Sequence, residues 1–395
     1  MTPAARIAAA AELLDAILAG APAEQILTRW ARASRFAGSK DRLAVRDLVF
    51  EALRRRRSCA ALGGTETGRG LMLGLVRARG EDPDTLFTGS GHAPAPLTGA
   101  ERAVAAGDLP EEVALDVPDW LAPRLRASLG ADFAAVMALL RDRAPVFVRV
   151  NLAKADRAAA QAALAEDGIA ARPHPLSPTA LELTENARKL HLGRAYRDGL
   201  VEVQDAASQA VCDHLPVPAA GTALDYCAGG GGKALALAAR PGVRVFAHDA
   251  EAQRMRDLPA RAGRSGVRID CLAPGAAGQA APYDLVLCDA PCSGSGAWRR
   301  SPDGKWRLTE ARLAELVRIQ ATILDAAAPL VAPGGVLAYA TCSLLDEENA
   351  AQATRFCARS AGWQCRAEHR FTPLDGGDGF YLALLERSGT GLTRA

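Results

Sequence analysis

Apolar residues recur every three or four positions through the first 60 residues of the chain, as at Leu13, Leu14 and Ile17. This spacing puts apolar side chains on one face of a helix, so it predicts packed helices over residues 4–60. Residues 63–100, rich in Gly, Pro and Thr, predict loops around one short helix.

The pattern changes at residues 146–150, where Val-Phe-Val-Arg-Val is a run typical of a strand. An Ala-rich helix is expected at 157–167, with extended stretches near 169–173 and 180–183. This β-α-β arrangement predicts a small α+β domain over residues 139–205.

Apolar runs alternate with helical patterns through the remainder, residues 206–395. Because each strand is an almost continuous apolar run, the pattern indicates an α/β domain: a doubly wound, parallel, Rossmann-like sheet covered on both faces. The expected strands are 222–227, 243–248, 268–272, 284–289, 336–341 and 379–386, and the expected helices are 233–239, 250–264, 309–330 and 346–361.

Composition narrows the class of protein. The chain has 395 residues, 49% hydrophobic and 23% charged, which is ordinary for a globular protein of two or three domains. It contains no apolar run of the roughly 20 residues that a membrane span needs, and no C-x-x-C pair. The sequence therefore predicts a cytoplasmic protein with no membrane association, no bound metal and no disulfide framework.

Charge is unevenly distributed although the formal net charge is only +2. Residues 1–80 contain fourteen Lys and Arg against seven Asp and Glu, including the run Arg-Arg-Arg-Arg at 54–57. Such a block is typical of a phosphate-binding face, although a solvated helix surface is the commoner origin of this pattern.

Ligands of a doubly wound sheet bind beyond the carboxyl ends of its strands. The first strand ends in a glycine loop, and a helix follows the loop. Glycines let a ligand approach the backbone closely, and the start of the helix offers free backbone amides. The second ends in Asp249, which can accept both hydroxyls of a ribose, and the third carries Asp270, placed to contact an adenine. These features fit an adenosyl cofactor or a dinucleotide equally well. The loop residues are Cys227, Ala228, Gly229, Gly230, Gly231, Gly232 and Lys233.

The next two strand ends favour the adenosyl cofactor. One carries Asp289-Ala290-Pro291-Cys292, and the other carries Thr341-Cys342-Ser343. Neighbouring strands would bring Asp289, Cys292 and Cys342 into one cleft. Both thiols follow a strand within small polar turns, where backbone amides can lower a thiol pKa. The other cysteines, Cys59, Cys212, Cys271, Cys288, Cys357 and Cys365, are interpreted as buried small hydrophobes.

At these motifs the chain resembles the Sun-type family of RNA cytosine-5 methyltransferases, and most closely its members that act on small-subunit ribosomal RNA. The D-A-P-C and T-C-S motifs carry the resemblance, supported by Glu347-Glu348-Asn349 and by residues 376–384. The family usually has Ala-Pro or Ser-Pro where this chain has Gly229-Gly230, which predicts a more flexible loop.

The resemblance implies S-adenosylmethionine as cofactor and RNA, 16S ribosomal RNA in particular, as partner of a monomeric enzyme. The loop 227–233 would hold the methionine part, with Asp249 on the ribose, Asp270 on the adenine and Asp289 also within reach. Cys342 would be the nucleophile, Cys292 the thiol that assists product release, and Asp289 the group on the cytosine edge.

The resemblance further implies a NusB-like helical RNA-binding domain at 1–138, an RRM-like linker at 139–205 and a methyltransferase domain at 206–395. Two alternatives stay open at this point. One is the same reaction on transfer RNA, and the other is a catalytically idle RNA-binding assembly factor.

Overall fold

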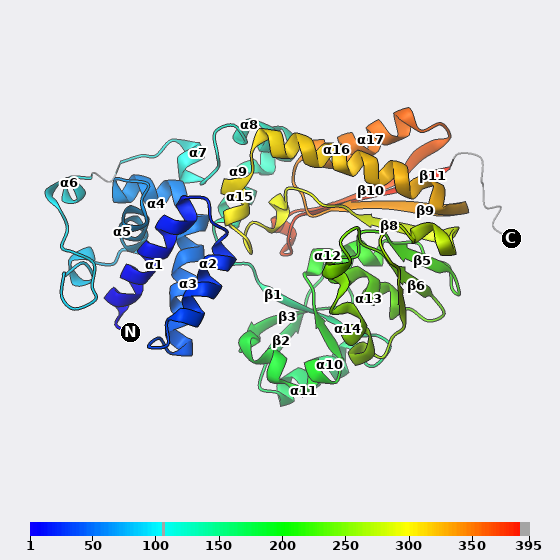
Figure 1. Ribbon diagram of the computed structural model, residues 1–395, viewed down its shortest axis with the longest axis horizontal. Helices are drawn as coiled ribbons and strands as arrows, with labels where there is room; N and C mark the ends of the chain where they lie inside the picture. The colour runs from blue at the N-terminus through cyan, green and yellow to red at the C-terminus, as the bar shows by residue number, and fades with distance from the viewer. Residues whose placement is uncertain (105–106, 388–395) are drawn as a thin grey trace. The chain divides into compact units, whose positions relative to one another are not determined.

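The computed structural model describes residues 1–104 and 107–387, which pack as two compact units (Figure 1). Unit 1 contains Met1–Arg143 together with Trp298–Leu308. Unit 2 contains Ala144–Ala297 and the chain from Thr309 onward. No helix within the described ranges combines the length and the apolar composition that crossing a bilayer requires.

Unit 1 is built of helices over the residues that the structure describes. Its apolar core lies between the first five helices, where Leu14, Val49 and Leu71 are fully buried. At Gly74 a Cβ would lie 1.8 Å from the carbonyl oxygen of Cys59, so glycine permits the close contact between α4 and α5. The helices are α1 Pro3–Leu18, α2 Ala23–Ala33, α3 Ser39–Arg54, α4 Arg56–Gly63, α5 Gly68–Ala78, α6 Gly99–Arg102, α7 Glu111–Ala114, α8 Ala122–Leu129, α9 Phe133–Leu140 and α15 Asp303–Arg307. The helices predicted over residues 4–60 are confirmed.

The segment Trp298–Leu308 joins unit 1 although it is flanked on both sides by unit 2. The Trp306 indole donates a hydrogen bond to the carbonyl of Leu53 at 2.6 Å, and Arg54 Nε donates to the carbonyl of Arg299 at 2.8 Å. The chain that leaves the Asp289–Cys292 turn is therefore anchored among the N-terminal helices before it returns.

Unit 2 begins with a four-stranded antiparallel sheet in the order β2-β3-β1-β4. Leu164 of its first helix is fully buried against this sheet, next to Val148. Its elements are β1 Val146–Val150, α10 Arg157–Glu166, β2 Ala170–Pro173, β3 Ala180–Glu185, α11 Arg194–Arg197 and β4 Val201–Val203.

The larger sheet of unit 2 has the strand order β10-β11-β9-β8-β5-β6-β7. Strands β5 to β9 are parallel, whereas β10 and β11 are antiparallel. The strands are β5 Thr222–Asp225, β6 Arg244–Ala247, β7 Ile269–Cys271, β8 Tyr283–Asp289, β9 Val331–Thr341, β10 Trp363–Phe371 and β11 Phe380–Arg387. The predicted α/β architecture with a parallel-rich sheet is confirmed, but the strand expected at 379–386, which is β11, pairs antiparallel with β9, so the expectation of a wholly parallel sheet is wrong there.

Helices cover both faces of this sheet, as Figure 1 shows. Alternate residues of one strand divide between the faces. Leu285 and Leu287 pack with α12 Ala206–Asp213, α13 Gly232–Ala238 and α14 Leu258–Ser265. Val286 and Cys288 pack with α16 Glu310–Ala327 and α17 Ala350–Arg359. A continuous apolar run such as β8 is therefore buried on both sides.

Candidate active site

Asp289 and Cys292 follow β8, and Cys342 follows β9, which lies beside β8 in the sheet. The register pairs Asp289 with Ala340, two residues before Cys342. The Gly296 amide then donates to the Cys342 carbonyl at 3.0 Å, which closes the two turns on each other. The Sγ atoms of Cys292 and Cys342 are 3.4 Å apart. The structure thus brings together the two thiols that lie fifty residues apart in the chain.

Both of these thiols are partly exposed and free. The hydrogen bond with Cys342, followed by burial, raises the pKa of Cys292 well above its usual value. The expectation of a lowered thiol pKa is therefore wrong for Cys292. The reason is that the Cys292 thiol lies against the Cys342 sulfur as well as near backbone amides, and the hydrogen bond between the two sulfurs has the larger effect on its pKa.

Lys233, at the start of α13, forms an ion pair with Asp289 at 2.6 Å. The lysine is 6% exposed, and its ammonium also lies 4.9 Å from the centre of the Phe380 ring. Burial lowers the pKa of Lys233, but attraction to Asp289 and their hydrogen bond outweigh it and raise the pKa above its usual value. Lys233 therefore stays charged and fixes the Asp289 carboxylate.

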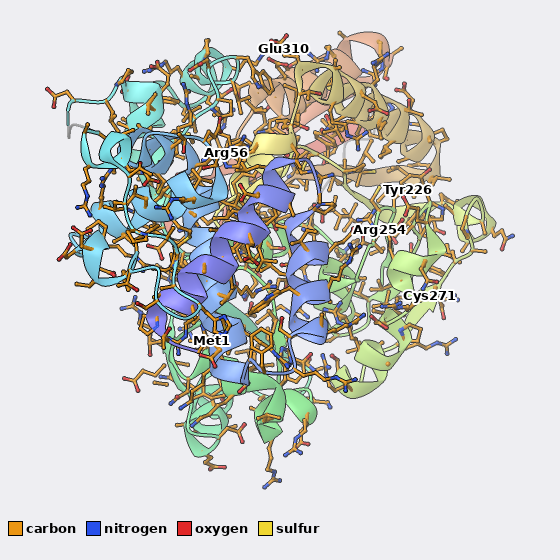
Figure 2. All side chains as sticks on the ribbon, turned by 60° about the vertical axis from the view of Figure 1, so that its left-hand side comes forward. Met1, Arg56, Tyr226, Arg254, Cys271 and Glu310 are labelled. Carbon is orange, nitrogen blue, oxygen red and sulfur yellow. The ribbon has the colours of Figure 1, made fainter. Side chains whose placement is uncertain are left out.

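The glycine loop is tied to the end of β6. The Gly229 amide donates to Asp249 Oδ2 at 2.9 Å, and Arg254, labelled in Figure 2, lies 3.4 Å from the same oxygen. Arg261 donates to the carbonyl of Gly230. Gly231 has a φ of +79°, and a Cβ there would lie 2.2 Å from Leu258. The loop and Asp249 are thus brought together as predicted.

Asp225 is a buried carboxylate beside the loop that the sequence interpretation left without a role. It ends β5, is 1% exposed, and neither of its oxygens has a hydrogen-bond partner among the described residues. Burial, with repulsion from Asp289 second, raises the pKa of Asp225 to about 7. Its place at the end of the strand that leads into the glycine loop was the signal that could have identified it.

Buried carboxylates without partners are costly unless a ligand satisfies them. S-adenosylmethionine carries an ammonium group on its methionine part, so the buried Asp225 carboxylate beside a loop of four glycines fits this cofactor.

Asp270 is not part of this cluster of contacts. Its carboxylate lies 2.9 Å from Arg244 and 3.3 Å from Arg268. The hydrogen bond from Arg244 is the main reason that the pKa of Asp270 is lowered. Its contact with an adenine stays a prediction.

Among the other cysteines, Cys59, Cys212 and Cys288 are buried as expected. Cys271 and Cys365 are exposed and Cys357 is partly exposed, so the interpretation as buried hydrophobes is wrong for these three. Cys271 and Cys365 lie on the outer strands of the sheet, β7 and β10, where a strand is open to solvent.

Comparison with known proteins gives two family matches. The family described as 16S rRNA methyltransferase RsmB/F matches residues 215–386, and the RsmF/B-like ferredoxin-like domain matches residues 117–188.

Two relatives are both named ribosomal RNA small subunit methyltransferase B. The one from Citrobacter koseri is 35% identical over 282 residues, and the one from Xylella fastidiosa is 37% identical over 288 residues. Each alignment covers 68% of this chain, and the chain spans 66% of the relative's length. Among solved structures, that of PH0851 has a TM-score of 0.78 and 23% identity, covering 98% of this chain and 99% of the other. It shares the fold.

Proposed function

The chain belongs to the RsmB/F family of 16S ribosomal RNA methyltransferases, and from this premise we propose that it methylates carbon 5 of a cytosine in 16S ribosomal RNA. The methyl donor is S-adenosylmethionine, and the reaction passes through a covalent bond between Cys342 and carbon 6 of the base. The observation that carries the proposal is the pair of sulfurs 3.4 Å apart, next to an Asp289 that is held by Lys233.

Carbon 5 of cytosine is too weak a nucleophile to take up a methyl group unaided. Addition of the Cys342 thiolate to carbon 6 converts the ring into an enamine, whose carbon 5 is nucleophilic. Cys342 is the thiol that adds, because it occupies the T-C-S motif to which the family resemblance assigns the nucleophile. The hydrogen bond with Cys342, followed by burial, raises the pKa of Cys292, which favours a protonated Cys292 during this step.

Asp289 acts on the opposite edge of the base. A carboxyl group at ring nitrogen 3 stabilises the charge that develops there as the thiolate adds. Lys233 keeps the carboxylate in one place, since their ion pair is short and the lysine is buried.

Product release needs a base and a leaving group. After methylation, Cys292 first releases its proton to water. The Cys292 thiolate then takes the proton from carbon 5, the electron pair of that bond forms the double bond between carbons 5 and 6, and Cys342 leaves as thiolate. The 3.4 Å between the two sulfurs supports this role for Cys292, because a base so close to Cys342 would be near the carbon adjacent to the one that Cys342 attacks.

The cofactor would be held by residues 227–233 with Asp249, Asp225 and Asp289 around them, and Asp270 toward the adenine. When bound, S-adenosylmethionine supplies an electrophilic methyl group. The chain's own part is to offer the side-chain-free backbone of Gly229 to Gly232 and an unpaired carboxylate at Asp225.

The RNA would contact the basic part of unit 1. The run at residues 54–57 is largely committed to internal contacts: Arg54 is buried, and the other three pair with Asp142, Glu66 and Asp119. Arg29, Arg32, Arg35 and Lys40 are exposed and are the better phosphate ligands. The bases of an RNA duplex cannot reach such a site, so the target is an unpaired cytosine. We propose that the enzyme acts as a monomer in the cytoplasm.

The proposal is tested by methylation of 16S ribosomal RNA from a strain that lacks this protein, read by bisulfite sequencing. The wild-type chain and a Cys365→Ala control, changed at an exposed thiol, should restore 5-methylcytosine at one position. Cys342→Ala should restore none. Methylation of transfer RNA alone, of no RNA, or at full rate by Cys342→Ala would overturn the proposal.

A further inference from the structure

Glu348 is a buried carboxylate outside the set of residues assigned above. It ends the short 3-10 turn Asp346–Glu348 and is 0% exposed. Burying a carboxylate is costly unless its oxygens are bound. Each of its oxygens accepts two hydrogen bonds; three of the donors belong to the two cysteine turns, and the fourth is Gln320 of α16.

The Cys292 turn is bound on both sides of the thiol. The Ser293 amide donates to Glu348 Oε1 at 2.9 Å, and the Ser293 hydroxyl donates to Oε2 at 2.6 Å. On the other side of Cys292, the Gln320 side chain donates to the carbonyl of Pro291 and to Glu348 Oε1, both at 3.0 Å. Ser293, which follows Cys292, is thus bound to the Glu348 carboxylate, and Pro291, which precedes it, is bound to Gln320, which itself donates to Glu348.

The Cys342 turn is bound in the same way. The Ser343 hydroxyl donates to Glu348 Oε2 at 2.6 Å. Asn349, the next residue along, accepts from the Thr341 hydroxyl at 2.5 Å and donates to the carbonyl of Ser343 at 2.9 Å. The residues flanking Cys342 therefore attach to the same two-residue segment, and Oε2 joins the two turns directly.

The donors to Glu348 are all neutral: two hydroxyls, a backbone amide and a side-chain amide. A neutral acceptor would connect these groups with a smaller desolvation cost, because an ion is more expensive to bury than an amide. A full negative charge next to two thiols instead resists the formation of a second anion there, and it raises the pKa of Cys292, after the larger effects of Cys342 and of burial.

We propose that Glu348 is a positioning residue of the site, which holds the Cys292 and Cys342 turns in register. The inference rests on the proposed function, because it assigns the two thiols different tasks. Loss of Glu348 would let the turns move relative to each other, and it would make Cys292 easier to ionise before Cys342 has added.

The test compares wild type with Glu348→Gln, which keeps the shape and removes the charge. Glu347→Gln is the matched control, since it makes the same change one residue earlier. We expect Glu348→Gln to lower kcat by 10- to 100-fold with KM for S-adenosylmethionine changed less than twofold, and Glu347→Gln to behave as wild type.

A second readout does not depend on methylation. The rate of alkylation of Cys292 by iodoacetamide is followed against pH, with the two cysteine peptides resolved by mass spectrometry. In Glu348→Gln the alkylation curve of Cys292 should move to lower pH, because the carboxylate charge no longer opposes the thiolate. Glu347→Gln, which removes a charge one residue away without breaking the bonds to either turn, should leave this curve where it is in wild type.

Wild-type kcat together with an unmoved alkylation curve in Glu348→Gln would overturn the inference. If that variant does not fold, Ser343→Ala replaces it, and a wild-type kcat there overturns the inference whereas a lower kcat at unchanged KM supports it. If wild type itself makes no 5-methylcytosine, the proposed function fails, and the alkylation curve still decides the role of Glu348.

Discussion

Lys233 in unit 2 and Lys305 in unit 1 are buried to a similar degree, 6% and 2% exposed, yet their pKa values move in opposite directions. Burial lowers the pKa of Lys305 to about 8, against a partial opposing attraction from Asp116. For Lys233, attraction and hydrogen bonding from Asp289 outweigh burial. Burial therefore does not decide the charge of a lysine by itself.

The difference lies in what the carboxylates do. Asp116 is fully buried and already binds Arg141 at 2.9 Å and both the amide and the hydroxyl of Ser58 at 2.9 Å. Its charge is thus shared, and the nearby Arg141 further disfavours a proton on Lys305. Asp289 has a dedicated lysine at 2.6 Å. Asp116, whose oxygens bind several groups, belongs to a structural cluster, whereas Asp289, paired with Lys233, is a carboxylate that is held in one place.

Breaking the dedicated pair gives the largest expected effect. Lys233→Met leaves Asp289 without its cation, and removal of one partner of a buried pair costs about 3 kcal/mol, or roughly a hundredfold in rate if the cost falls on the transition state. We expect at least that loss in methyl transfer, measured as kcat/KM on 16S ribosomal RNA. Lys189→Met, at an exposed lysine, is the control and should match wild type. Equal activity of the two variants would show that Lys233 does not hold Asp289 in place for the reaction.

Lys305 should instead affect stability, and only as pH rises. Its folded pKa of about 8 lies below its ordinary 10.5, so between these values the unfolded chain holds a proton that the folded chain has released. Stability contributed by Lys305 therefore increases with pH across this window. Between pH 7 and pH 9.5 the free energy of unfolding of wild type should increase by about 2 kcal/mol more than that of Lys305→Met.

Urea unfolding followed by tryptophan fluorescence measures this difference, because Trp30, Trp120, Trp298 and Trp306 all lie in unit 1. The control Lys40→Met changes an exposed lysine of the same unit and should run parallel to wild type. If the difference in free energy of unfolding between wild type and Lys305→Met stayed constant across the pH range, the pKa of Lys305 would not be lowered by burial.

The sequence predicted the parallel strands well because a strand buried on both faces must be apolar throughout, as β8 is. It missed β10 for the converse reason. This strand lies at the edge of the sheet, has β11 as its one partner among the described residues, and exposes Gln364, Cys365 and Arg366 in succession. Such a strand carries no apolar run, and only its partner in space identifies it.

The site divides along similar lines. The glycine loop and the cysteine motifs are local and were visible in the sequence, and strand order alone predicted that Cys292 and Cys342 would meet. The roles of Asp225 and Glu348 were not visible, because they depend on which polar atoms find partners after folding. The raised pKa of Cys292 likewise comes from a sulfur that is distant in sequence.

The central claim is that Cys342 forms the bond to the base and Cys292 releases it. Incubation of Cys292→Ala with S-adenosylmethionine and 16S ribosomal RNA, followed by denaturing electrophoresis and peptide mass spectrometry, tests it most directly. We expect a protein–RNA adduct that survives denaturation, maps to Cys342 and is absent from the Cys292→Ala/Cys342→Ala double variant. An adduct on another residue, or one that persists in the double variant, would contradict it.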